Sequence, residues 1–137
     1  VYGPVKLGTL ELKNWTVRAF PLKADSMVRA PKGKGPSQKR EGAHFRAVVN
    51  IEEPQDTFLD MSRYVKGYVW VNGINVGRYW NVGPQLRLYV PAPFLKKGEN
   101  VIDILDLHEK EPKPVRGMKE RNKEPGKINT KNLDNQW

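Results

Sequence analysis

The sequence lacks cysteine altogether and contains only two histidines. Without cysteine, neither a disulfide bond nor thiolate chemistry contributes to structure or function. The histidines, His44 and His108, have no partners at metal-ligand spacing, so we expect no transition-metal site. Long apolar runs are also missing, and none approaches the roughly 20 residues of a membrane-spanning helix. We therefore expect neither a metal centre nor a membrane partner.

Acidic residues are in the minority, with 15 Asp and Glu against 24 Lys and Arg, which gives a net charge of +9. The basic excess lies in residues 23–42 and 109–137, which show no regular apolar alternation. A nucleic-acid surface combines such charges with stacking aromatics, whereas the aromatics here lie in the predicted strands. We therefore expect no nucleic-acid partner and interpret the charge as solvated loops that favour solubility.

Asn72-Gly73 lies between two runs of alternating apolar residues. Asn and Gly both tolerate the positive φ that a two-residue type I′ turn requires, so this dipeptide predicts a β-hairpin. The two-residue loop predicts three cross-strand pairs: Val71 with Ile74, Trp70 with Asn75, and Val69 with Val76. Because side chains alternate across a strand, the four aliphatic residues of these pairs should share one face and pack on the core.

Further alternating segments predict strands at 5–12, 15–20, 44–51, 57–61, 85–90 and 101–107. No amphipathic helix separates them, which indicates an all-β fold, an antiparallel β-sandwich or jelly roll. We expect one sandwich domain over residues 1–108, interrupted by a long basic loop at 23–42. Residues 109–137, rich in proline and charge, are predicted to form an irregular or disordered tail. If this tail packs on the sandwich, its candidate anchors are Val115, Met118, Ile128 and Trp137.

One stretch carries motifs specific enough to suggest a family. The motifs are DTFLDM at 56–61, KG at 66–67, WVNG at 70–73, GRYWN at 77–81, GPQ at 83–85 and LKKGEN at 95–100. In this order and spacing, residues 56–107 resemble the C-terminal β-sandwich of family 35 glycoside hydrolases, the β-galactosidases. The resemblance covers about 52 of the 137 residues. It implies a jelly-roll, galactose-binding-like fold downstream of a catalytic barrel, and it favours a periplasmic or secreted location.

The resemblance supplies no catalytic site. The family's catalytic residues are two glutamates at the ends of barrel strands, and such a barrel needs about 250 residues. None of the glutamates here lies in a matching motif, so no catalytic residue is carried over. The resemblance implies a non-catalytic module that supports the architecture of a parent β-galactosidase. Its implied partners are the catalytic barrel and galactose-containing glycans.

Sugar recognition combines an aromatic ring, which packs on the apolar face of the sugar, with planar polar groups that bond its hydroxyls. The candidate sugar-binding or docking residues of this kind are Trp70, Asn75, Arg78, Tyr79, Trp80, Asn81 and Gln85. Trp, Tyr and Arg are also enriched at protein interfaces, so structural docking to a neighbouring domain is favoured over direct sugar binding. Packing of these rings in the core alone is a further alternative. A third hypothesis is a free-standing lectin-like module that binds an acidic polysaccharide through the lysine-rich segments.

Four aspartates, Asp56, Asp60, Asp103 and Asp106, offer the oxygen ligands that calcium prefers. No EF-hand-like loop connects them, and Asp103 and Asp106 alternate with core residues of a predicted strand. We therefore expect no cofactor, with a structural calcium ion at these aspartates as the less favoured alternative.

Overall fold

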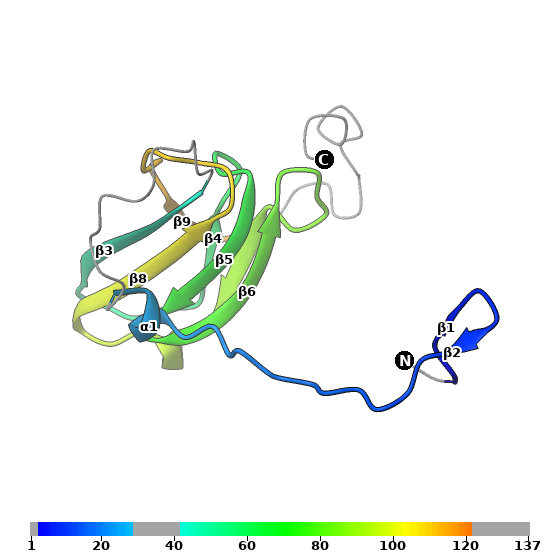
Figure 1. The fold of residues 1–137 in the computed structure, drawn as a ribbon. Helices are drawn as coiled ribbons and strands as arrows, with labels where there is room; N and C mark the ends of the chain where they lie inside the picture. The colour runs from blue at the N-terminus through cyan, green and yellow to red at the C-terminus, as the bar shows by residue number, and fades with distance from the viewer. Residues whose placement is uncertain (1–2, 29–41, 122–137) are drawn as a thin grey trace.

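The computed structural model describes residues 3–28 and 42–121, and its main body is two antiparallel sheets packed face to face (Figure 1). The four-stranded sheet has the order β3 (Ala43–Ile51), β8 (Gly98–Asp106), β5 (Lys66–Val71), β6 (Ile74–Trp80). The three-stranded sheet has the order β7 (Arg87–Val90), β4 (Thr57–Asp60), β9 (Arg116–Met118). A short 3-10 helix, η1 (Ala92–Phe94), lies between β7 and β8 in the chain. The expected all-β antiparallel sandwich is confirmed.

The core lies between the two sheets, where alternate side chains of facing strands meet. Val69 of the large sheet and Val90 of the small sheet are fully buried. The buried cluster consists of Leu59, Met61, Tyr64, Val69, Val71, Tyr79, Leu88, Val90 and Ile104. Burying one such aliphatic side chain contributes about 1.5–3 kcal/mol relative to leaving it exposed. The contact between the sheets is therefore the main source of stability.

The Asn72-Gly73 turn forms as predicted, with φ of 50° and 83° at the two residues. The Asn72 side chain also ties the hairpin to a neighbouring loop. Its amide nitrogen donates to the Phe94 carbonyl and to Asn100 Oδ1, both at 2.8 Å. Its oxygen accepts a hydrogen bond from the Val101 N–H at 2.9 Å. One asparagine thus supplies both the turn conformation and the link from the hairpin to the start of β8.

A β-bulge in the hairpin changes the predicted register. The two pairs next to the turn form as predicted, but Val69 pairs with Gly77 instead of Val76. Gly77 has a φ of 135°, which favours glycine. Because two residues of β6 face one of β5, alternation beyond the bulge shifts by one and Tyr79 points into the core. Ile74, beside the turn, is 43% exposed, so it does not join the predicted core face.

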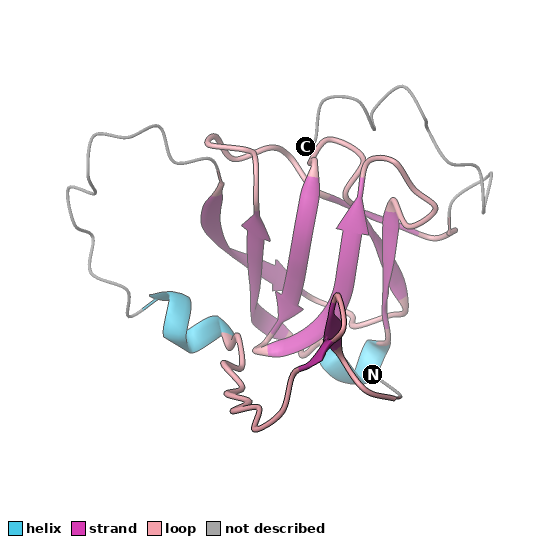
Figure 2. Cartoon of the chain, turned by 45° about the vertical axis from the view of Figure 1, so that its right-hand side comes forward, coloured by secondary structure: helices cyan, strands magenta, loops and turns pink. Residues whose placement is uncertain are grey.

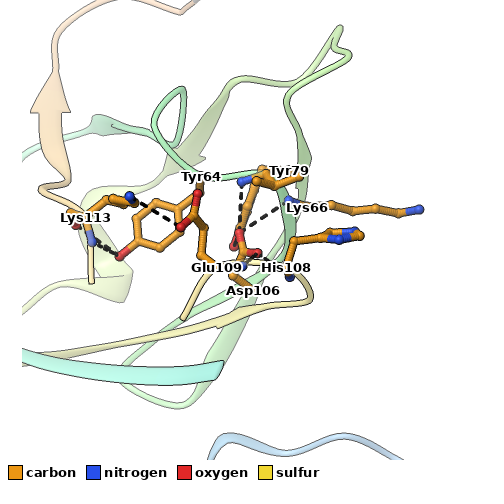
Figure 3. Close-up of polar contacts among 8 residues, drawn as sticks. Tyr64, Lys66, Tyr79, Asp106, His108, Glu109 and Lys113 are labelled. Atoms are coloured by element: carbon orange, nitrogen blue, oxygen red, sulfur yellow. Dashed lines mark hydrogen bonds and ion pairs between the residues drawn. The ribbon is translucent and has the colours of Figure 1, made fainter. Parts of the chain in front are cut away.

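Tyr79 reaches a buried carboxylate at one end of the sandwich, as Figure 3 shows. Its hydroxyl donates to Asp106 at 2.9 Å. Asp106 also accepts hydrogen bonds from backbone N–H groups, those of Val65 (3.0 Å), Lys66 (3.3 Å), His108 (2.8 Å) and Glu109 (2.8 Å). Burial, reinforced by the Asp106 charge, raises the pKa of the Tyr79 hydroxyl, so the hydroxyl remains a donor. A side chain at Gly67 would collide with this hydroxyl and with the Leu105 backbone.

The described C-terminal segment closes the same end of the sandwich. The Tyr64 hydroxyl donates to the Lys113 carbonyl at 3.0 Å and accepts from the Lys113 N–H at 2.9 Å. Val115 then packs against the core, and β9 pairs with β4. The prediction of irregular structure from residue 109 onward is therefore wrong at β9. A three-residue strand shows too little alternation to be recognised locally, and it forms because it can pair with the edge of β4. Ile128 and Trp137 lie outside the described residues.

The beginning of the chain does not join the sandwich. Within the predicted strand segment 5–12, which has a bend at Gly8-Thr9, the structure has β1 (Lys6–Leu7) and β2 (Leu10–Glu11), which pair only with each other. The strand predicted at 15–20 does not form. Figure 1 shows this small hairpin apart from the two packed sheets, and in the turned view of Figure 2 it lies in front of them. The sandwich therefore begins at Ala43 rather than at residue 1.

Helix α1 (Ala24–Val28) occupies the start of the segment predicted as a long basic loop. Ala24 is buried, so the helix begins against the rest of the fold. Five residues are too few for a recognisable amphipathic period, which is why the sequence pattern does not reveal this helix. The rest of the predicted loop, residues 29–41, lies outside the described residues. Neither described helix is long and apolar enough to cross a membrane.

We predict that Tyr79→Phe lowers the free energy of unfolding by about 1–3 kcal/mol, because the buried Asp106 carboxylate loses one of its donors. The matched control is Tyr68→Phe, at a ring that is 37% exposed, where a change within about 0.5 kcal/mol is expected. Urea denaturation followed by tryptophan fluorescence measures both variants. Equal effects of the two substitutions would contradict the structural role of Tyr79.

Candidate functional site

Three cross-strand pairs lie next to one another on the outer face of β5 and β6. Since Val69 and Val71 point into the core, the alternate residues of β5 point outward. The observed pairs on this face are Lys66 with Trp80, Tyr68 with Arg78, and Trp70 with Asn75. Each pair joins an aromatic ring to a cationic or amide side chain. We call these six residues the outer-face cluster.

Two cations share the ring of Trp80. Lys66 Nζ lies 4.5 Å from the ring centroid, and the guanidinium carbon of Arg78 lies 5.3 Å from it. Cation–π contacts of this kind contribute about 0.5–1 kcal/mol at exposed sites. A neutral sugar would therefore compete with these two side chains for the face of Trp80.

The other two rings of the cluster differ in exposure. Trp70 is 2% exposed, whereas Tyr68 is 37% exposed, and their centroids lie 6.2 Å apart. Arg78 and Asn75 are both exposed. Tyr68, with Arg78 paired beside it, is therefore the most accessible ring of the outer-face cluster, and the buried Trp70 is its ring neighbour.

The remaining predicted site residues lie elsewhere. The bulge reverses the direction of Tyr79 and places it in the core. Its ring therefore offers no surface to a ligand. Asn81 and Gln85 belong to the bend after β6, where the Asn81 N–H donates to the Val65 carbonyl at 2.7 Å. The Gln85 carbonyl accepts from the Trp80 N–H at 3.3 Å. The structure thus brings together Trp70, Asn75, Arg78 and Trp80 on the outer face, leaves Asn81 and Gln85 in the bend next to Trp80, and turns Tyr79 into the core.

Lys66 and Tyr68 were not among the predicted site residues. A signal for Tyr68 was present in the sequence, because it lies two residues before Trp70 in the hairpin predicted from Gly67, and Lys66 comes directly before that hairpin. A period of two places all three on one face. The pairing of Lys66 with Trp80 required the bulge, which no sequence pattern revealed.

A buried ion pair lies beside Trp70 on the same outer face. Asp103, 1% exposed, pairs in register with both Trp70 and Arg46. Arg46 donates to the Asp103 carboxylate through Nε at 2.7 Å and Nη2 at 2.9 Å, and His44 Nε2 lies 2.8 Å from it. Burial alone would raise the pKa of Asp103, but the bonds from Arg46 and His44 outweigh it and hold that pKa below its usual value.

The four aspartates considered for calcium do not gather at one site. Asp103 and Asp106 project to opposite faces of β8, towards the contacts described above. Asp56 accepts hydrogen bonds from the Tyr89 hydroxyl at 2.7 Å and from the Ala92 N–H. Asp60 forms an ion pair with Arg87 at 3.7 Å. Over residues 3–28 and 42–121, no group of three or more His, Asp or Glu side chains is arranged to hold a metal ion.

A groove of about 640 Å³ opens between the edge strand β3 and the segment that contains β9. Its lining is mainly apolar and includes Ala47, Val49, Ile51, Ile102, Val115 and Met118. None of the seven predicted site residues lines it. The groove and the outer-face cluster are therefore separate features, although the groove also contains aromatic rings, those of Phe45 and Tyr64, and the amide of Gln55.

Comparison with known protein families identifies the family of the strand-rich region. Residues 43–100 match the family described as "Beta-galactosidase, galactose-binding domain". These residues belong to that family. The galactose-binding domain thus includes β3 to β7 and the start of β8, and with them the whole outer-face cluster. The resemblance seen in the sequence motifs is confirmed.

Individual relatives agree with this assignment. The chain is 39% identical over 90 residues to a beta-galactosidase of Xanthomonas manihotis, covering 64% of this chain and 14% of the relative. It is 35% identical over 108 residues to beta-galactosidase-1-like protein 2 of Homo sapiens, covering 76% and 17%. It is 50% identical over 70 residues to beta-galactosidase 8 of Oryza sativa subsp. japonica, covering 50% and 10%. The matched region is therefore less than a fifth of each of these proteins.

We predict that acid weakens the fold partly through Asp103. A carboxylate with a lowered folded-state pKa stabilises the fold above its unfolded pKa of about 3.9, and this contribution is lost as pH falls through the folded value. Asp103→Asn should therefore destabilise the protein at neutral pH, by roughly 2–4 kcal/mol, and progressively less as the pH falls below about 3.9.

Urea midpoints measured across this pH range test the effect. Asp60→Asn is the matched control, because its ion pair with Arg87 is longer, at 3.7 Å, and should matter less. A stability difference between wild type and Asp103→Asn that does not change with pH would contradict the prediction.

Proposed function

We propose that this chain acts as a non-catalytic accessory domain of a larger family 35 β-galactosidase-like glycoside hydrolase. The observation that carries the proposal is the family match of residues 43–100 to a galactose-binding domain. The chain also spans only 14% and 17% of two of the β-galactosidase relatives that it matches. In this role the domain contributes to the architecture of the parent enzyme, and the catalytic domain of that enzyme is its partner.

The buried carboxylates support a non-catalytic role. A glycosidase needs two carboxyl groups that flank a sugar, about 5–9.5 Å apart and open to substrate. Asp103 and Asp106, the buried acids of β8, lie on opposite faces of the strand, and each is held by several donors. Their chemistry is that of structural anchors, because both carboxylates are occupied by hydrogen bonds within the fold.

We further propose that the outer-face cluster binds galactose-containing glycans. Tyr68 offers an exposed ring on which the apolar face of a sugar can pack. Arg78 and Asn75 are exposed on the neighbouring strand and supply donors and an acceptor for sugar hydroxyls. Because two cations share Trp80, we place the sugar on Tyr68 rather than on Trp80.

A second candidate ligand is an acidic polysaccharide. The observation that favours it is the position of Lys66 and Arg78, which hold two positive charges beside one ring. A carboxylate-bearing sugar would bond Arg78 bidentately while its ring packs on Tyr68. Salt separates the two candidates, because ionic contacts weaken as ionic strength rises and neutral stacking does not.

We predict that the purified chain does not hydrolyse a chromogenic galactoside. The reason is that the catalytic barrel of the proposed parent enzyme needs about 250 residues, more than the 137 present here. Release of the chromophore is followed by absorbance against a buffer blank and against an intact β-galactosidase. Turnover above the blank that co-purifies with the chain would disprove the non-catalytic role.

We predict that Tyr68→Ala weakens glycan binding at least about tenfold, because the exposed stacking ring is lost. Calorimetry with a galactose oligosaccharide and with an oligogalacturonate, each at low and physiological ionic strength, measures the affinity. The matched control is Tyr89→Ala, which removes an exposed ring from the other sheet and should leave binding unchanged. Binding to neither sugar, or equal loss in both variants, would exclude the outer-face cluster as the site.

A further inference from the structure

Trp70 is buried although it points away from the core. Its ring lies on the outer face of β5 and is 2% exposed, whereas Tyr68, two residues earlier on the same face, is 37% exposed. Val69 and Val71 fill the space between the sheets, so the core does not cover Trp70. Among the described residues its indole N–H has no hydrogen-bond acceptor, which is rare for a buried donor. A surface outside the two sheets therefore covers the ring and leaves its donor unused.

Helix α1 lies over this part of the sheet. Ala24 is 3% exposed but does not belong to the core cluster between the sheets, so it is buried against an outer surface. The hydrogen bond with Asp103 raises the pKa of Arg46, and the charge of Asp25 acts on Arg46 in the same direction, which places Asp25 near that side chain. Figure 1 shows α1 beside the end of β5, the strand whose second-last residue is Trp70. The helix is thus positioned to cover Trp70.

The side chains beside Trp70 are of the kinds that sugar recognition requires. Asn75 pairs with Trp70 in register on one side, and Asp103 pairs with it on the other. Arg46, the next residue in this row, binds the Asp103 carboxylate through Nε and Nη2, which leaves further N–H donors of the guanidinium for another acceptor. The row therefore places amide and guanidinium groups around one aromatic ring, and the bonds to Asp103 hold the guanidinium in place.

We propose that Trp70 is the stacking ring of a second glycan subsite, which α1 covers until a galactose-containing oligosaccharide displaces the helix. The inference rests on the proposed function, because it extends the same outer face from Tyr68 to the next row of the sheet. The centroids of the two rings lie 6.2 Å apart, so one oligosaccharide can contact both. In the covered state Asp25 acts on Arg46, and sugar hydroxyls replace it when α1 moves away.

The contact of α1 with the sheet is small enough to be exchanged for a ligand. The helix contains five residues, fewer than the roughly 12–15 at which an isolated helix becomes even marginally stable. Ala24 is buried, whereas the next two residues, Asp25 and Ser26, are exposed. Displacement therefore gives up little burial and frees the indole donor of Trp70 for the sugar. The apparent affinity of the closed protein is reduced by the fraction of molecules in which α1 is open.

The first part of the test asks whether α1 is the cover, and it compares Ala24→Glu with Ser26→Glu in the 137-residue chain. Both substitutions introduce the same charge in α1, but only Ala24 is buried, so only Ala24→Glu should detach the helix. The indole N–H signal of Trp70, assigned by its loss in Trp70→Phe, reports the cover through hydrogen exchange. We expect exchange at least about tenfold faster in Ala24→Glu than in wild type and unchanged in Ser26→Glu.

The second part measures binding by calorimetry with a linear galactose tetrasaccharide. Ala24→Glu should bind at least about fivefold more tightly than wild type, because opening of the helix no longer reduces the affinity. Trp70→Leu combined with Ala24→Glu should remove this gain while the melting temperature stays within about 4 °C of that of Ala24→Glu. The tetrasaccharide should also shift the Trp70 indole N–H signal in Ala24→Glu, a readout that needs no substitution at Trp70.

Different outcomes would reject different parts of the proposal. An unchanged exchange rate of the Trp70 indole N–H in Ala24→Glu would show that α1 is not the cover. An exposed Trp70 without a gain in affinity, or with a signal that the tetrasaccharide does not shift, would show that the ring is not a subsite. In both cases, binding that Tyr68→Ala abolishes would leave the proposed function intact. Absence of binding in wild type and in every variant would reject the proposed glycan binding and the subsite together.

Discussion

The direction of every side chain in the second half of β6 depends on the single bulge opposite Val69. Without the extra residue, strict alternation would turn Tyr79 towards solvent and Arg78 and Trp80 towards the core. With it, Tyr79 reaches the buried Asp106, and the two other side chains meet Lys66 on the outer face. One local irregularity therefore decides both how one end of the sandwich is closed and which residues form the outer-face cluster.

The two buried aspartates of β8 hold different parts of the sandwich together. Asp106, on the inner face, gathers Tyr79 and four backbone donors and so fixes where β8 ends. Asp103, on the outer face, joins β3 to β8 through Arg46 beside the buried Trp70. Buried charges are stable only when fully paired, so these contacts hold the four-stranded sheet in one register. The same pairing leaves neither acid open to a substrate, which agrees with an accessory domain.

The sandwich and the start of the chain differ in how completely their apolar surface is covered. The sandwich encloses a core shared by two sheets, whereas residues 5–22 expose most of their large side chains.

Local patterns were sufficient for features that depend on neighbouring residues. Alternation predicted the strands of the sandwich, Asn72-Gly73 predicted its turn, and the GRYWN motif indicated the family. The bulge, the short strand β9, helix α1 and the separation of the N-terminal hairpin were decided by tertiary contacts. The physical reason is the distance along the sequence between the residues that stabilise each feature. A turn or an alternating strand is stabilised by residues adjacent in sequence, whereas the inward position of Tyr79 depends on Asp106, 27 residues further along the chain.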